Sequence, residues 1–173
     1  SQQKIDDLKK QWEQPEPKVA TVTHKPVPGD AVALMRIPKF GETWVEPVLY
    51  GTDDSTLSKG LGWYEGTAGP GEVGNFAIAG HRGSKGPFAA MQNLVPGDKV
   101  IVETKQFVFT YVIDNVPKDT VVKNTDVWVV DPVPGKPNEK PTKALMTLTT
   151  CQDLFRSPDR MITFTHLESK QAK

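Results

Sequence analysis

From residue 31 onward the chain is divided into short apolar segments of β-strand length by turns that contain Gly, Pro, Asn or Asp. Several of the segments are rich in Val, Ile, Thr, Phe and Tyr, the residue types that favour strands. Two interruptions, 53–60 with a Ser or Asp cap and 87–94 before a Pro-Gly turn, are predicted to be short helices. The eight predicted strands are 31–37, 45–51, 75–80, 99–105, 107–114, 127–133, 144–151 and 161–167. This pattern predicts a mainly β fold, a mixed barrel or sandwich.

The first 30 residues have a different pattern. Ile5, Leu8 and Trp12 form a helical stripe, which predicts a helix over 1–13. Residues 14–30 are a Pro-rich segment in which each X-Pro step disfavours helix, so we expect an extended linker. The predicted organisation is therefore an N-terminal helix and linker over 1–30 and one domain over 31–173. We expect the helix either to dock on the domain or to lead to an upstream anchor.

The composition limits the partners. Apolar residues make up 37% and charged residues 24%, as in folded globular proteins. The 21 basic and 21 acidic residues give a formal charge of zero, so no nucleic-acid partner and no polybasic membrane patch are expected. No apolar run is long enough to span a bilayer and no secretory signal is present, so we interpret the chain as a truncated or processed ectodomain.

A single cysteine, Cys151, excludes an intramolecular disulfide and a closed zinc site with several cysteines. Glu72, Asp53 and Asp54 are not spaced like the ligands of a calcium loop, so we predict no metal site, and we expect no cofactor. A lone cysteine is either buried packing or a functional thiol.

Three residues with complementary chemistry follow or precede predicted strands. Cys151 ends the run TLTTC, His81 follows the strand at 75–80, and Arg160 precedes the strand at 161–167. If the last two strands pair as antiparallel neighbours, Cys151 and Arg160 flank one shallow site. A nucleophile, a proton carrier and a charge donor would then meet at strand ends. Arg156 is a competitor for the third role, whereas His24 and His166 are interpreted as structural.

TLTTC followed by an Arg, together with the upstream AIAGH at 77–81, resembles the sortase family of cysteine transpeptidases. The matching features run from about residue 31 to 167. The segments 62–82 and 140–151 are most similar to class E sortases of actinobacteria, with class D as the neighbouring alternative. Gln152 and the loop that follows it depart from some relatives, which leaves the substrate more open than the mechanism.

The resemblance implies an eight-stranded sortase-type β barrel on a membrane-anchored enzyme that faces the cell wall. It implies that Cys151 attacks the Thr–Gly bond of an LAxTG- or LPxTG-like sorting motif and that His81 exchanges the proton. Arg160 would donate hydrogen bonds to the substrate carbonyl or to the oxyanion. Thr150 would add a backbone N–H or hydroxyl there. Tyr64 would contact the substrate, or simply pack under its loop.

The implied partners are surface proteins that carry a C-terminal sorting signal and an amine acceptor such as a peptidoglycan precursor. A hydrolase that uses water as the acceptor and a catalytically silent wall-binding module are the alternatives.

Overall fold

The computed structural model describes residues 2–13, 26–83, 85–151 and 158–173. These residues form nine strands, two α-helices and four short 3-10 helices. The strands are β1 Ala31–Arg36, β2 Glu46–Tyr50, β3 Leu61–Trp63, β4 Gly74–His81, β5 Lys99–Glu103, β6 Phe107–Ile113, β7 Val121–Lys123, β8 Ala144–Cys151 and β9 Asp159–Ala172. The helices are α1 Gln2–Glu13, α2 Asp54–Leu57, η1 Pro38–Phe40, η2 Met91–Asn93, η3 Pro117–Asp119 and η4 Val127–Val130.

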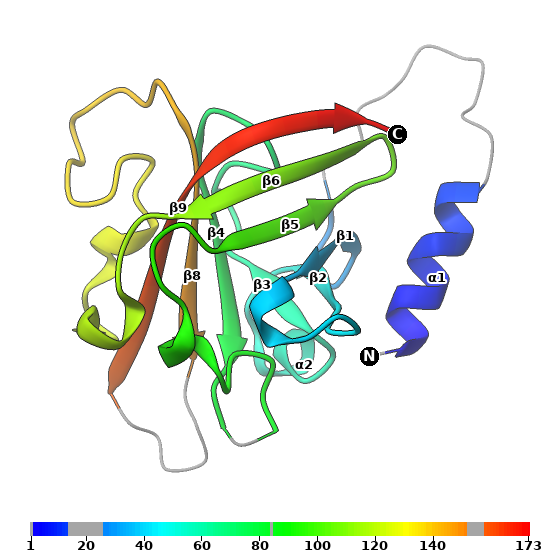
Figure 1. Ribbon diagram of the computed structural model, residues 1–173, viewed down its shortest axis with the longest axis horizontal. Coiled ribbons are helices and arrows are strands. Elements are labelled where there is room, and N and C mark those ends of the chain that lie inside the picture. Colours follow the sequence, from blue (N-terminus) through cyan, green and yellow to red (C-terminus); the bar gives the residue numbers. More distant parts are fainter. Residues whose placement is uncertain (1, 14–25, 84, 152–157) are drawn as a thin grey trace.

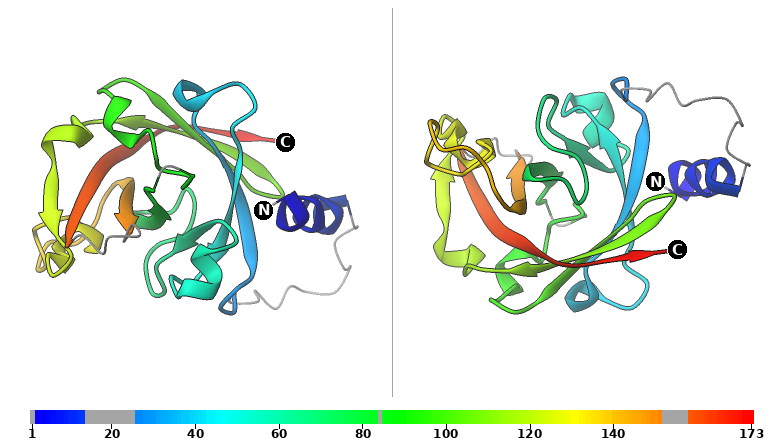
Figure 2. Two further views of the ribbon diagram at one scale, coloured as in Figure 1. Left: turned by 90° about the horizontal axis from the view of Figure 1, so that it is seen from below. Right: turned by 90° about the horizontal axis from the view of Figure 1, so that it is seen from above.

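Eight of the strands close into a mixed barrel (Figures 1 and 2). Their order is β6-β5-β1-β2-β3-β4-β8-β9, and β9 pairs with β6 to complete the circle. The pairs β2–β3 and β4–β8 are parallel, whereas the remaining pairs are antiparallel. The ninth strand, β7, pairs with the first residues of β9, 159–161, before the part of β9 that pairs with β6 and β8. The predicted mainly β, eight-stranded barrel is confirmed.

One predicted strand is wrong, and another strand takes its place in the barrel. Residues 127–133 were expected to form a strand, but the structure has the 3-10 helix η4 at Val127–Val130. Two prolines, Pro132 and Pro134, follow closely and have no N–H to donate to a sheet. The eighth barrel strand is instead β3. This segment contains Gly62 and follows Gly60, and glycine does not favour strands, so the sequence pattern did not indicate a strand there. Its Gly62 is required by close packing, because a Cβ there would collide with the Gly51 carbonyl.

The barrel interior is filled by apolar side chains such as Phe76, Phe88 and Tyr111, all fully buried. In β4, residues 74–80 are buried on both faces of the strand. This double burial explains why β4 has an almost continuous apolar sequence instead of an alternating one. The outer face of β4 and β8 is covered by the segment that contains η4, the yellow region beside β8 in Figure 1.

Helix α1 was predicted over 1–13, and the structure confirms it at Gln2–Glu13. Ile5 and Leu8 form a small apolar cluster with Leu34 of β1, and Trp12 packs against that cluster. The helix lies beside β1, near the end of β9 (Figure 2). Among the described helices, none has the length and apolar character that a membrane span requires.

Candidate active site

The parallel pairing of β4 with β8 brings together the two residues of most chemical interest. The register runs from Gly74 opposite Ala144 to His81 opposite Cys151 without interruption. Both strands end at the same edge of the barrel, at the bottom of Figure 1. His81 and Cys151, seventy positions apart in sequence, are thus direct neighbours across two hydrogen-bonded strands.

The backbone around His81 is fixed by the loop that follows it. The amide of Phe88 donates to the carbonyl of His81 at 2.9 Å, and the Phe88 ring packs into the barrel. The preceding residue, Gly80, leaves room for this ring, since a Cβ there would lie 2.6 Å from Phe88 Cδ2. A glycine is therefore required at position 80, because a larger residue would displace the Phe88 ring. Phe88 in turn fixes the end of β4 through its hydrogen bond to the His81 carbonyl.

Arg160 reaches the site from the other side of β8. Strand β9 pairs antiparallel with β8, with Thr149 opposite Ile162, which is the condition that the sequence analysis set for a shared site. Extended by two residues along each strand, this register corresponds to Arg160 opposite Cys151. In β9, Arg160 also pairs with Val122 of β7, and its Nη1 donates to the Asp159 carbonyl at 3.3 Å. Cys151 therefore ends β8, whose two neighbours are β4, which ends at His81, and β9, whose second residue is Arg160.

Next to this strand end is a pocket of about 110 Å³, which we call the arginine pocket. Arg160 lies on its surface together with Tyr64 and Thr149. The residues that line it from η4 are Val127, Val129 and Val130. The pocket thus combines the charged groups of Arg160, Lys123 and Asp126 with hydroxyl groups and an apolar wall.

The two hydroxyl residues predicted for the site have different surroundings. Tyr64 Oη lies 3.2 Å from Thr149 Oγ1, and both residues line the arginine pocket. Thr149 is two positions before Cys151 in the sequence. Thr150 is 2% exposed, and its Oγ1 accepts from the Met161 amide at 2.9 Å. The Thr150 hydroxyl therefore ties β9 to β8.

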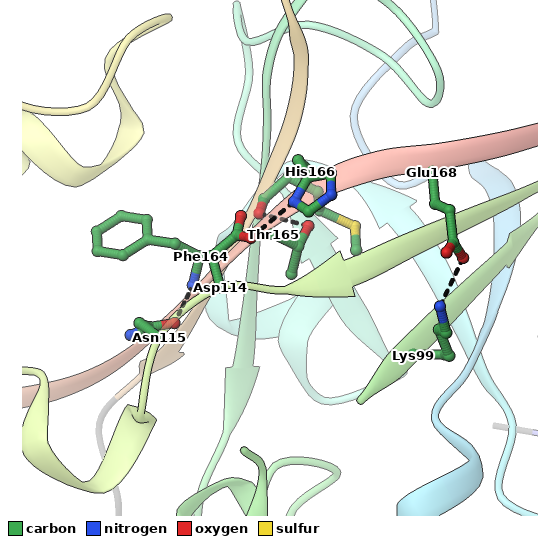
Figure 3. Close-up of polar contacts among 8 residues, drawn as sticks. Lys99, Asp114, Asn115, Phe164, Thr165, His166 and Glu168 are labelled. Atoms are coloured by element: carbon green, nitrogen blue, oxygen red, sulfur yellow. Dashed lines mark hydrogen bonds and ion pairs between the residues drawn. The ribbon is translucent and has the colours of Figure 1, made fainter. Parts of the chain in front are cut away.

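His166 lies in β9 opposite Leu145, six positions along β8 from Cys151. Its Nδ1 is 2.7 Å from Asp114 Oδ1 (Figure 3). Asn115 Oδ1 accepts from the Phe164 amide, and the distance is 2.8 Å. Both contacts are drawn in Figure 3, and they connect this part of β9 to the two residues that follow β6. His24 and Arg156 lie outside the described residues.

Sequence reasoning missed a polar network on the outer face of the central strands. Asn75 and Thr147, both 1% exposed, are hydrogen-bonded to each other, and Asn75 also binds the backbone of the η4 segment. The available signal was a single amide at the start of the apolar run NFAIAG. Across the described residues, no three His, Cys, Asp or Glu side chains are grouped so that they could hold a metal ion.

Comparison with known proteins gives a consistent result. The family model for the sortase domain matches residues 35–168. Sortase SrtE1 of Streptomyces coelicolor is 39% identical over 145 residues, which are 79% of this chain and 40% of that protein. Sortase D of Bacillus subtilis is 29% identical over 127 residues, 73% of this chain and 57% of that protein. The chain thus spans about half the length of these curated relatives.

Solved structures agree with this result over almost the whole domain. Sortase E from Streptomyces avermitilis superposes with a TM-score of 0.75 at 43% identity, covering 84% of this chain and 93% of that one. A sortase D5 transpeptidase from Clostridium perfringens gives a TM-score of 0.78 at 26% identity, covering 97% and 98%. With the family model, the sequence identity and the barrel in agreement, the chain belongs to the sortase family.

Proposed function

We propose that this chain is a cysteine transpeptidase that cleaves a sorting motif between Thr and Gly and transfers the acyl group to an amine. The observation that carries the proposal is the register that pairs His81 with Cys151, with Arg160 on the neighbouring strand. All three residues lie on strands of the barrel, an arrangement that favours a fixed backbone for each of them.

In the proposed reaction, Cys151 Sγ attacks the Thr carbonyl carbon and the bond to the Gly nitrogen breaks. His81 donates the proton that the leaving amine needs, and a thioester remains on Cys151. Arg160 stabilises the negative oxygen with its forked N–H donors, for which a permanently charged planar group is suited. An acceptor amine then attacks the thioester, loses a proton to His81 and releases the cysteine.

The proposed substrates are surface proteins with a C-terminal sorting signal, and the acceptor is a peptidoglycan precursor or a pilin lysine. We place the enzyme on the outer face of the plasma membrane, on the cell-wall side, anchored through a segment N-terminal to α1. Within the motif, we propose that Ala is preferred over Pro at the second position, because Tyr64 at the arginine pocket offers a hydroxyl to the Ala N–H.

Product masses test the proposal and separate it from hydrolysis. The chain is incubated with an LAxTG peptide, with and without glycine-based or lysine-based amines, and the products are weighed. A transpeptidase gives a product that contains the added amine, in proportion to its concentration. Only the free acid at every amine concentration would identify a hydrolase, and intact peptide throughout would indicate a non-catalytic module.

A further inference from the structure

Asn75 is a buried amide that joins the central strands of the barrel to the segment covering them. Its Nδ2 donates two hydrogen bonds, to the carbonyl of Val129 at 3.0 Å and to that of Asp131 at 2.9 Å. The two accepting carbonyls are two residues apart, one in η4 and one just after it. A single side chain therefore holds both the end of η4 and the start of the chain that leaves it.

Thr147 fixes the orientation of that amide. Its Oγ1 donates to Asn75 Oδ1 at 2.8 Å, and Thr147 lies opposite Ala77 in the β4–β8 register. Backbone carbonyls can only accept, so the Asn75 NH₂ group must face η4 and its oxygen must face Thr147. Each polar atom of the pair has a partner, and losing one would leave buried groups unsatisfied.

The segment held in this way forms one side of the arginine pocket. Val129 and Val130 are part of the pocket wall, whereas Tyr64, Thr149 and Arg160 belong to the side built on the barrel. Asn75 is six positions before His81 on β4, and Thr147 is four positions before Cys151 on β8. The strands β4 and β8 therefore carry both the proposed reacting residues and the Asn75–Thr147 pair, which tethers the η4 segment to the barrel.

We propose that Asn75, oriented by Thr147, is a positioning residue that sets the distance between the η4 wall and the β4–β8 strands, and so the fit of the peptide. This inference rests on the proposed function, since the pocket is taken to bind the sorting motif. Asn75 does not touch the reacting atoms. Its loss should weaken peptide binding while the chemistry at Cys151 continues.

The test uses Asn75→Leu, which keeps the side-chain size without polar atoms, and the milder Thr147→Val. For Asn75→Leu we expect KM for an LAxTG peptide to rise about tenfold, as expected when buried polar groups lose their partners. For Thr147→Val we expect KM to rise about threefold. Thr147→Ser keeps the hydroxyl, so its KM should equal that of wild type. In all three variants, kcat and the rate of Cys151 alkylation should stay within about twofold of wild type.

Thr165→Val is the matched control. It removes an equally buried hydroxyl, which donates to the Met146 carbonyl at 2.9 Å instead of to the Asn75 amide. We expect its KM to equal that of wild type. A rise in KM as large as that of Thr147→Val would mean that any buried hydroxyl of the barrel matters equally, and would overturn the proposal.

Hydrogen exchange of residues 127–131 gives a readout that needs no turnover. Asn75→Leu should speed exchange there about tenfold, because the tether is lost. Unchanged hydrogen exchange in Asn75→Leu would overturn the positioning role, and so would faster exchange with an unchanged KM. A decrease in kcat or in the rate of Cys151 alkylation, with no change in KM, would also overturn it. If wild type turns over no sorting peptide, the proposed function fails, whereas unchanged exchange in Asn75→Leu shows failure of the tether itself.

Discussion

Tyr64 and Thr149 share one hydrogen bond, 3.2 Å long, at the edge of the arginine pocket. When Tyr64 donates to Thr149, its remaining lone pairs can accept the N–H of a substrate Ala, which Pro lacks. We expect Tyr64→Phe to narrow the Ala/Pro ratio of kcat/KM about fivefold without stopping turnover. The measurement compares LAxTG and LPxTG peptides.

Tyr50→Phe is the matched control for that prediction. Tyr50 Oη accepts from the Gly66 amide at 3.1 Å and does not line the arginine pocket. The Ala/Pro ratio of this variant should equal that of wild type. An equal ratio in Tyr64→Phe and wild type would instead mean that Tyr64 only packs beneath its loop.

Arg160 tests whether the forked guanidinium matters or only its charge. Arg160→Lys keeps the positive charge but loses the planar set of donors, so we expect kcat/KM to fall about a hundredfold. Arg156→Lys is the control from the same stretch of chain, and we expect it to lose less than about threefold. Comparable losses in the two variants, or the reverse order, would move the role away from Arg160.

At the level of single residues, the sequence identified the residues with distinctive chemistry. Cys151 is the single cysteine, and His81 and Arg160 adjoin apolar runs of strand length, so their grouping followed from strand ends. Asn75 could not be found in the same way. An amide at the start of an apolar run indicates a turn or a cap as readily as a tether, and its partners, Val129 and Asp131, are backbone groups 54 and 56 positions away.

At the level of elements, α1 is joined to the barrel by few side chains. Leu8 is 2% exposed within the cluster of Ile5 and Leu34, and Lys173 Nζ lies 4.4 Å from the Trp12 ring centre. We expect Leu8→Ala to weaken the docking of α1 by about 2–4 kcal/mol. Hydrogen exchange over residues 2–13 should therefore become faster.

The same variant should leave kcat/KM at the wild-type value, because α1 packs on β1, away from the β4–β8 strand ends. Lys9→Ala, at an exposed position of the same helix, is the control and should change neither quantity. A matching loss of kcat/KM in Leu8→Ala would show that the helix supports the site.

The predictions of helices and strands were correct where the local sequence pattern agreed with the tertiary packing. The helix α2 has the expected cap, with Asp53 accepting from the Thr56 amide at 2.7 Å. The segment VWVVDPV has strong strand propensity, but it became η4 because prolines prevent pairing and Asn75 binds its carbonyls. Strands β3 and β7 have three residues each, too short to give a local pattern.

At the level of the whole molecule, barrel stability should depend on Tyr111 at high pH. Burial raises the pKa of Tyr111 to about 12. The Gly71 amide, which donates to Tyr111 Oη at 2.8 Å, acts in the opposite direction and lowers the pKa, but its effect is smaller. In the unfolded chain the pKa is about 10, so the folded state holds the proton more tightly. The stabilisation is complete below about pH 10 and is lost as the pH rises through about 12.

We therefore expect the free energy of unfolding to fall by up to about 3 kcal/mol across this window through Tyr111. Tyr111→Phe has no proton to lose there, so its unfolding free energy should decline less steeply than that of wild type. Denaturant titrations at several pH values measure both slopes. Equal slopes would show that another group controls the alkaline transition.

The central claim is that Cys151, held between His81 and Arg160 at one edge of the barrel, forms a thioester with the substrate. The most direct measurement is the intact mass of the protein after rapid acid quenching of its reaction with an LAxTG peptide. In wild type we predict a mass increase equal to the acyl fragment that ends in Thr, which is the mass of the corresponding free acid less one water. Hydroxylamine should remove this adduct. Cys151→Ala should show neither adduct nor cleavage, with a nearly unchanged thermal midpoint. Peptide cleavage by folded Cys151→Ala would contradict the account.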